Sequence, residues 1–293
     1  MSVFDKDNQP VADAEALKRH IAQALAAKPP HGLDVDITYR LMKSLYKPMV
    51  FGAENIPERP CLFVGNHSLF ALDGLIIMPV FLKELHRFPR AMGDKILFTN
   101  RRIAELFVRN GLVMGHPEVC TALMKDRQDM LVFPGGAHEA VKPASAKYEL
   151  QWKERYGFVK LAAKHGYTIM PFGLVGPDEF YGHIMEGQDL PESALGRLLA
   201  YLGVLNENTR RDILPPIPVG SLGTLFPKPQ RCYLGFGQPV NLSKYKGKTL
   251  QKKTLHSIRD DVAEQIETQL AQLLITREQN RGKDGLLRRL LTL

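Results

Sequence analysis

Short apolar runs alternate with stretches of helical periodicity along this chain, and this alternation constrains the fold more than any other feature. The apolar runs are CLFVGN, RAMGDK, GLVMGH, MLVFPGG, YTIMPFGLVG and RCYLGFGQPV, which begin at residues 61, 90, 111, 130, 167 and 231. The helical patterns between them are GLIIMPVFLKEL, RRIAELFVRNG, VCTALMKDRQ and ERYGFVKLAAKHG. Strands that alternate with helices form βαβ units, whose parallel sheet is covered on both faces. The sequence therefore predicts an α/β fold with a mainly parallel central sheet flanked by helices.

The remaining segments suggest additions to this unit. Residues 13–27 have helical periodicity before Pro29 and Pro30, so residues 1–33 are expected to form an N-terminal helical extension. Residues 34–293 would form the main domain, with a long amphipathic helix from Thr254. Residues 182–222 contain an apolar helix and then several prolines. This segment is interpreted as an insertion, with a helix packed on the core as the alternative.

A second helix is predicted from Asp34, and Pro48 would end or bend it. Its periodicity places four apolar residues on one stripe, namely Ile37, Leu41, Leu45 and Met49.

The positive charge of the chain indicates an anionic partner. There are 39 Lys and Arg against 31 Asp and Glu, a formal net charge of +8. Such a charge suits an anionic membrane surface or a nucleic acid, or serves only solubility. The lysine cluster in residues 243–253 contains a single aromatic residue, Tyr245, and no helix-turn-helix, RRM or KH signature occurs, so a nucleic-acid partner is not favoured. The C-terminal GLLRRLLTL has a basic amphipathic composition suited to a bilayer interface, with subunit packing as the alternative.

No membrane span or secretion signal is predicted. The longest apolar stretch, residues 71–82, is shorter than the about 20 residues that a span needs, and Asp73 interrupts it. The three cysteines, Cys61, Cys120 and Cys232, lie in apolar sequence without a CxxC pair, so buried free thiols in a reducing compartment are expected. The expected location is the cytoplasmic face of a membrane, bound peripherally.

The sequence NHSLFALDG follows the first predicted strand and contains a candidate base. His67 would accept a proton from a hydroxyl while Asp73 orients its ring and stabilises the imidazolium. The alternative is that His67 and Asp73 are unrelated loop residues without a catalytic role. Ser68 is adjacent to His67 and no GxSxG elbow occurs, so a substrate hydroxyl would attack directly, without an acyl-enzyme.

A second polar strand end is FPGGAHEA, residues 133–140. Gly135 and Gly136 allow a tight turn whose N–H groups form an oxyanion or phosphate cradle. The carboxyl ends of parallel strands meet at one edge of a sheet, so both segments are expected to share one site. None of the nine histidines forms an HExxH or HxxxH pair, so no metal site is predicted. No cofactor is expected beyond an acyl thioester as co-substrate.

These motifs resemble those of the PlsC-like glycerolipid acyltransferase superfamily. GNHSLFALDG, FPGGAHEA and TIMPFG occur in the family's order over roughly residues 50–240, and PGGA-E resembles the diacylglycerol-acyltransferase-like branch. The resemblance implies that His67 is the catalytic base and Asp73 its partner. It also implies that Gly135, Gly136 and Glu139 lie in the acceptor or oxyanion region, and that Pro171 lies in the family's later proline-containing strand. The candidate for the family's phenylalanine-and-arginine motif is GDKILFTNRR, with substrate-binding positions at Phe98, Arg101 and Arg102.

Two departures from the family pattern bear on the reaction. Five residues separate His67 from Asp73 where the family's first motif has four. The phosphate-acceptor branch reads FPEGTR, but Gly135 and His138 stand where that pattern has Glu and Arg. A fixed cation for an acceptor phosphate is therefore missing, which favours a neutral acceptor.

The expected function is transfer of a fatty acyl group from acyl-CoA or acyl-carrier protein to a lipid hydroxyl, with diacylglycerol or a long-chain alcohol as acceptor. Apolar residues after Asp73 and in the helix over 194–205 would line the acyl-chain path. The alternatives are a lysophospholipid or lysophosphatidate acyltransferase, an acyl hydrolase and a basic nucleic-acid-binding protein.

Overall fold

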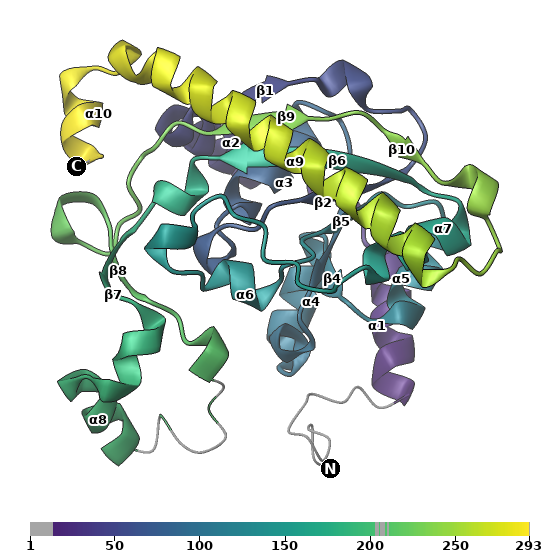
Figure 1. Ribbon diagram of the computed structural model, residues 1–293, viewed down its shortest axis with the longest axis horizontal. Helices are drawn as coiled ribbons and strands as arrows, with labels where there is room; N and C mark the ends of the chain where they lie inside the picture. The colour runs from purple at the N-terminus through teal and green to yellow at the C-terminus, as the bar shows by residue number, and fades with distance from the viewer. Residues whose placement is uncertain (1–13, 203–204, 206–208, 210, 293) are drawn as a thin grey trace.

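A central eight-stranded sheet organises the molecule (Figure 1). The computed structural model describes residues 14–202, 205, 209 and 211–292. Seven strands lie in the order β1-β9-β6-β2-β5-β3-β4, and β10 pairs with β6 outside this path. Their bounds are β1 Met49–Phe51, β2 Cys61–Gly65, β3 Arg90–Gly93, β4 Leu112–Met114, β5 Met130–Val132, β6 Thr168–Val175, β9 Tyr233–Phe236 and β10 Val240–Asn241.

The middle of the sheet is parallel, which confirms the predicted fold class. Strands β4, β3, β5, β2 and β6 all pair in parallel. Strands β9 and β10 pair antiparallel with β6, and β1 runs parallel to β9. All six predicted apolar runs contain a strand, whereas the short strands β1 and β10 were not predicted. Because β2, β5 and β6 are parallel neighbours, the loops that follow them lie at one edge of the sheet.

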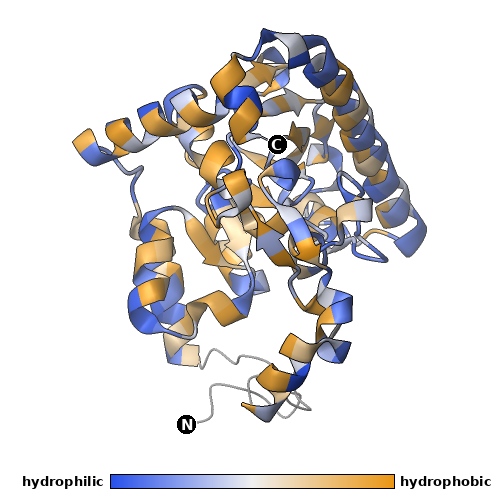
Figure 2. Cartoon of the chain, turned by 90° about the vertical axis from the view of Figure 1, so that its left-hand side faces the viewer, coloured by the Kyte–Doolittle hydropathy of each residue, from blue (hydrophilic) through white to orange (hydrophobic). Residues whose placement is uncertain are grey.

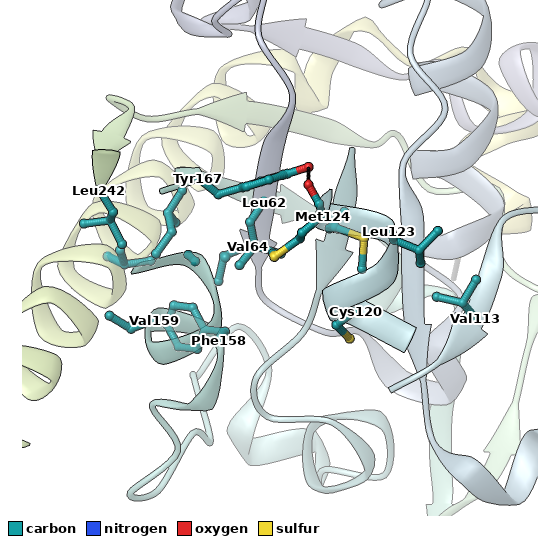
Figure 3. Packing of buried hydrophobic residues seen from close by; sticks show 14 of the residues in the cluster. Leu62, Val64, Val113, Cys120, Leu123, Met124, Phe158, Val159, Tyr167 and Leu242 are labelled. Carbon is teal, nitrogen blue, oxygen red and sulfur yellow. Dashed lines mark hydrogen bonds between the residues drawn. The ribbon is translucent and has the colours of Figure 1, made fainter. Parts of the chain in front are cut away.

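Helices cover both faces of this sheet. One layer contains α1 Ala14–Ala26, α4 Arg101–Arg109, α5 Pro117–Lys125, α7 Gly157–His165 and α9 Lys252–Asn280, and the other contains α2 Leu33–Tyr46 and α3 Gly74–Lys83. Strand β2 shows why both layers are needed, because successive side chains point to opposite faces. Leu62 and Val64 enter the first core, where Figure 3 shows them near Val159 and Met124, whereas Cys61 and Phe63 enter the second. Each such buried side chain contributes roughly 1.5–3 kcal/mol.

The helix predicted from Asp34 has the expected end but not the expected contacts. It ends at Tyr46, just before Pro48, and Met49 belongs to β1. Its buried residues are Met42 and Tyr46. Ile37 and Leu41, which lie on the predicted apolar stripe, are 56% and 59% exposed. A large part of the apolar stripe of α2 therefore faces outward.

Helix α1 packs on the first core and lies within the expected N-terminal extension, whose residues 1–13 are outside the described residues. Leu17 and Ala24 are buried there, and the Nε2 of His20 accepts a hydrogen bond of 2.9 Å from the Met114 N–H. The three cysteines are buried and unpaired, as predicted.

The segment interpreted as an insertion contains a small sheet of its own. Strands β7 Gly182–Met185 and β8 Ile217–Val219 pair antiparallel, apart from the central sheet. Helix α8 Ala194–Tyr201 lies between them in sequence, and only Gly196 of α8 is buried. A helix packed firmly on the core, the alternative from the sequence, is therefore not what α8 forms. Residues 203, 204, 206–208 and 210 of this segment lie outside the described part of the chain.

Candidate active site

The two polar motifs lie together at the carboxyl edge of the sheet. Residues 66–73 follow β2, and residues 133–140 follow β5, which is the parallel neighbour of β2. The second segment includes the short helix α6 Ala137–Ala140. A hydrogen bond from the His67 N–H to Oε2 of Glu139, 2.7 Å long, joins the two segments directly. The sheet topology thus brings together the residues that the sequence predicted to share a site.

His67 and Asp73 form a close pair. The Nδ1 of His67 lies 2.6 Å from Oδ2 of Asp73, whose side chain is almost completely buried. The same oxygen accepts a hydrogen bond of 2.6 Å from the Ser68 N–H, and the Ser68 Oγ accepts one of 2.8 Å from the Asp73 N–H. A carboxylate at Nδ1 selects the tautomer that carries its proton there, which leaves Nε2 as a proton acceptor.

The extra residue between His67 and Asp73 is accommodated by an unusual loop backbone. Phe70 and Ala71 have φ angles of 55° and 57°, within the left-handed region. For residues other than glycine this conformation costs of order 1 kcal/mol each. The hydrogen bonds around Asp73 hold the loop in that shape, so the longer spacing still produces the pair.

Phe133 covers one face of the imidazole. Its ring stacks on His67 with centroids 4.3 Å apart and an angle of 8° between the planes. Burial lowers the pKa of His67 and is the largest single effect. The charge of Asp73 and its hydrogen bond raise this pKa, and so does the charge of Glu139, whereas the charge of Lys142 lowers it. The net result is a pKa above that of an ordinary histidine.

The glycine turn differs in one detail from the predicted oxyanion cradle. Gly136 has φ 53° and ψ −137°, a conformation that requires glycine. Its N–H is not free, however, because it donates to the Phe133 carbonyl at 3.0 Å. Within the described chain, the N–H groups of Gly135 and Ala137 have no such partner. They replace the Gly136 N–H as the candidate donors of this turn.

Glu139 is also placed differently from the expectation. Its side chain is fully buried, and its second oxygen, Oε1, accepts a hydrogen bond of 2.8 Å from the Gln151 N–H. Both carboxylate oxygens are thus bound to backbone groups of the protein. Glu139 holds the site together and is not open to an acceptor.

Three further buried residues at this edge were missed from the sequence. The Asn66 side chain pairs with both the N–H and the carbonyl of Leu174 on β6. Lys142 donates to the His67 carbonyl at 2.9 Å and forms a buried ion pair of 2.7 Å with Asp178. Asp178 follows β6 closely, so the rule that singled out the loops after β2 and β5 would also have found it.

A cation also lies beside the glycine turn. Nη1 of Arg155 donates to the carbonyls of Pro134 and Gly135, at 2.9 Å and 2.6 Å, and Nη2 lies 3.2 Å from Nδ1 of His138. Nε2 of His138 in turn lies 3.3 Å from the Asp212 carboxylate in the segment between β7 and β8. His138 is therefore paired and largely covered. A cavity of about 550 Å³ adjoins the turn and is lined by both Phe133 and Arg155.

The remaining predicted positions lie apart from this cluster. Phe98 packs edge-on against His20 of α1, with ring centroids 5.0 Å apart. Arg101 is 84% exposed and pairs with Glu105 on the same helix, while Arg102 is exposed beside it. No contact joins these three residues to His67 or Asp73 within the described chain.

Pro171 lies inside the sheet. It is buried within β6, opposite Val64 of β2. On the side of β6 opposite β2, β9 ends at Phe236 and β10 begins at Val240. Proline has no backbone N–H to donate, and Pro171 lies where the antiparallel pairing is interrupted, so no hydrogen bond of the sheet is lost. This position supports the sheet and is not a substrate surface.

Among the residues that the structure describes, no group of three or more His, Cys, Asp or Glu side chains is placed to hold a metal ion.

Comparison with known proteins agrees with the motifs. A family model described as Acyltransferase matches residues 47–175, which include both polar motifs and β6. Phytyl ester synthase 1, chloroplastic, from Arabidopsis thaliana is 29% identical over 79% of this chain and 35% of its own length. Phytyl ester synthase 2, chloroplastic, from the same plant is 27% identical over 85% of this chain and 37% of its own.

The chain thus spans little more than a third of the length of these two relatives. A crystal structure of the 1-acyl-sn-glycerophosphate acyltransferase PlsC from Thermotoga maritima is 15% identical, with a TM-score of 0.46, over 88% of this chain and 83% of the other. The match to the Acyltransferase family model thus lies on the segments that carry the dyad and the glycine turn, and residues 47–175 are similar to that family.

Proposed function

We propose that this protein transfers a fatty acyl group from an acyl thioester to the hydroxyl of a lipid-like acceptor. Nε2 of His67 takes the hydroxyl proton as the oxygen attacks the thioester carbonyl, and Asp73 stabilises the imidazolium. The tetrahedral intermediate collapses by breaking the carbon–sulfur bond, and the thiolate leaves with the proton from His67. The products are an ester and a free thiol, of CoA or of an acyl-carrier protein.

The observation that carries this proposal is the His67–Asp73 pair, 2.6 Å apart, next to the glycine turn of an acyltransferase-family domain. Direct attack is favoured because Ser68 is not available as a nucleophile. Its Oγ is bound to the Asp73 N–H, and the residue is 2% exposed. The N–H groups of Gly135 and Ala137 are the proposed oxyanion donors, and one such donor is typically worth about 3–4 kcal/mol in the transition state.

A neutral acceptor, such as a long-chain alcohol or diacylglycerol, is the preferred substrate in this proposal. Arg155 supplies a cation at the turn, but its guanidinium is bound to two backbone carbonyls and lies beside His138. In this proposal the Arg155 guanidinium therefore stabilises the turn and does not bind an acceptor phosphate. The two Arabidopsis relatives are named for phytyl esters, which are esters of an uncharged long-chain alcohol.

An apolar cavity directly after Asp73 is a candidate for the acyl chain. It has a volume of about 370 Å³ and lies between α2 and α3, where Leu75 and Met78 of α3 face Val35 and Tyr39 of α2. The cavity reaches Gly74, the residue that follows Asp73 in the sequence. The exposed leucines of α8 remain a second candidate lining.

Binding to an anionic membrane surface, on its cytoplasmic side, is also part of the proposal. No helix in the described residues is long and apolar enough to cross a bilayer. Helix α10 Leu286–Leu291 instead exposes Leu286, Leu287 and Leu290, while Arg288 points inward to the carbonyls of Ser44 and Leu45. The loop after β8, near α10, exposes Leu222, Leu225 and Phe226. Helix α8 exposes Leu195 and Leu198, and Leu202, which follows the last residue of α8, is exposed as well. These elements lie along one side of the molecule (Figures 1 and 2), as for an interfacial surface.

The membrane surface can be tested by flotation with vesicles that contain anionic phospholipid. Leu286→Ser combined with Leu287→Ser should reduce the bound fraction several-fold. Leu25→Ser on α1, at the opposite side of the molecule (Figure 1), is the matched control and should bind like the unaltered protein. Equal binding of all three proteins would remove α10 from the proposal.

Acyl transfer to a panel of acceptors tests the function. The unaltered protein should form esters from acyl-CoA and a long-chain alcohol or diacylglycerol, and should transfer poorly to lysophosphatidate. Efficient transfer to lysophosphatidate would contradict the neutral acceptor, and release of fatty acid alone would assign the protein to the hydrolases. Acyl-carrier protein is compared with acyl-CoA as donor in the same assay.

A further inference from the structure

We propose that Glu139 is a positioning residue for His67 and that, together with the buried Lys142–Asp178 pair, it fixes the segment that carries the base. The inference rests on the proposed function for the reaction that it serves. The contacts and the charges that carry it belong to the structure of the site alone.

Glu139 fixes the start of the segment through its backbone. Its Oε2 accepts the His67 N–H at 2.7 Å and its Oε1 accepts the Gln151 N–H at 2.8 Å. The carboxylate fills the space beside Gly135, because a Cβ on Gly135 would lie 2.1 Å from the Glu139 Cδ. The FPEGTR pattern has its own carboxylate at the position of Gly135. In this chain Gly135 has no side chain, and the carboxylate in that space belongs to Glu139, four residues later in the sequence.

The Lys142–Asp178 pair fixes the rest of the segment. Lys142 Nζ donates to the His67 carbonyl at 2.9 Å, and Asp178 Oδ1 accepts the Leu69 N–H at 3.0 Å. The two side chains are 2.7 Å apart and each is only 1% exposed. A buried ion pair often adds little to stability compared with apolar residues of the same size. Its two bonds to the segment around the base indicate a role in placing that segment.

The charges that face His67 act on its proton in opposite directions. Asp73 in its own loop and Glu139 after β5 favour the imidazolium, whereas Lys142 opposes it. Asp178, beyond β6, is paired with Lys142, and Phe133 offers the ring an apolar face. A neutral residue in place of Glu139 should therefore lower the pKa of His67, and a neutral pair in place of Lys142 and Asp178 should raise it. A general loss of stability cannot produce opposite shifts.

The first test is an NMR titration of His67 in the full chain, together with kcat and KM. In Glu139→Gln the amide has one acceptor oxygen for two backbone donors, so we expect a lower His67 pKa and a kcat reduced about 10- to 100-fold at little change in KM. The double variant Lys142→Met with Asp178→Asn leaves no unpaired buried charge and should raise the His67 pKa. Glu54→Gln and Lys252→Met, at exposed positions, are the matched controls and should leave both quantities unchanged.

The second test is a double-mutant cycle on the shared space. Gly135→Ala should lower the melting temperature clearly in the unaltered protein, because its Cβ meets the Glu139 carboxylate. In the Glu139→Ala background the same change should have a much smaller effect. Additive effects would contradict the overlap.

The proposal is overturned if Glu139→Gln leaves the His67 pKa and kcat unchanged, or if both charge variants shift the pKa in the same direction. The pKa outcomes are independent of the proposed function, whereas kcat is measured only where acyl transfer occurs. Failure of acyl transfer itself would show in the unaltered protein, whereas the NMR titration reports the positioning of His67 without any substrate.

Discussion

The imidazole of His67 is held between a carboxylate and an aromatic ring, with Nδ1 at 2.6 Å from Asp73 and one face stacked 4.3 Å from Phe133. The first contact fixes the tautomer and the second fixes the plane of the ring. Together they fix the ring and leave Nε2, on the side of the ring away from Asp73, as the proton acceptor. The pair forms across a loop with two non-glycine residues in the left-handed region, which indicates that the surrounding hydrogen bonds determine the shape of the loop.

Asp73→Asn should lower kcat about 10²- to 10⁴-fold. The amide can turn its NH₂ group toward Nδ1 and favour the tautomer that protonates Nε2, which cannot act as a base. The measurement is kcat with acyl-CoA and a long-chain alcohol, with circular dichroism to show that the fold is kept. A folded variant with kcat within threefold of the unaltered protein would show that Asp73 does not orient His67.

The pH profile should reflect the raised pKa of His67. The base works in its neutral form, so kcat/KM should rise with pH through the His67 pKa of the free enzyme. Because the pKa lies above the ordinary value of 6.5, the acid limb should lie above pH 6.5. Asp73→Asn removes the carboxylate that raises this pKa, so its residual activity should have an acid limb at lower pH. An acid limb that stays in place in this variant would argue against His67 as the titrating group.

Gly136→Ala should destabilise the turn and impair transfer. A side chain at φ 53° and ψ −137° is strained, at a cost of about 1–3 kcal/mol. We expect a lower free energy of unfolding in urea and a kcat reduced at least about tenfold. Gly282→Ala is the matched control, because a Cβ there meets no atom within 4 Å and its backbone needs no glycine. Equal stability of the two variants would contradict the strained turn.

Arg155→Lys should reduce kcat about tenfold, because an ammonium group cannot reproduce the guanidinium contacts to the Pro134 and Gly135 carbonyls. Each lost bond to a charged group is worth roughly 1.5–3 kcal/mol. The control is Arg87→Lys at the opposite edge of the sheet, where Arg87 binds the Pro57 and Arg59 carbonyls and also the Asp129 carboxylate. Both variants should unfold at lower urea concentration, but only Arg155→Lys should lower kcat of the remaining folded enzyme. The same loss of kcat in both variants would mean that Arg155 acts through stability alone.

The sequence predicts the frame of this molecule well because strands are marked by local apolar runs. All six runs contain strands, and the rule that parallel strands end at one edge brought His67 and Glu139 into one site. Helix α2 shows the limit of periodicity. The pattern identifies an apolar stripe, but only tertiary packing decides that Met42 and Tyr46 are buried while Ile37 and Leu41 are exposed.

The supporting contacts of the site could not be predicted from spacing. Lys142 reaches the His67 carbonyl across 75 positions, and Asp178 reaches the Leu69 N–H across 109. Such pairs depend on which strands become neighbours, which no local pattern encodes. For Glu139 the sequence motif identified the residue. It did not predict that the carboxylate would bind the backbone N–H groups of His67 and Gln151.

The most direct test of the account is single-turnover transfer of a labelled acyl group from acyl-CoA to a long-chain alcohol by the unaltered protein and by His67→Ala. Loss of the general base should slow transfer about 10²- to 10⁴-fold while the melting temperature stays within a few degrees. Transfer by a folded His67→Ala variant at a rate within a few-fold of the unaltered protein would contradict the central claim.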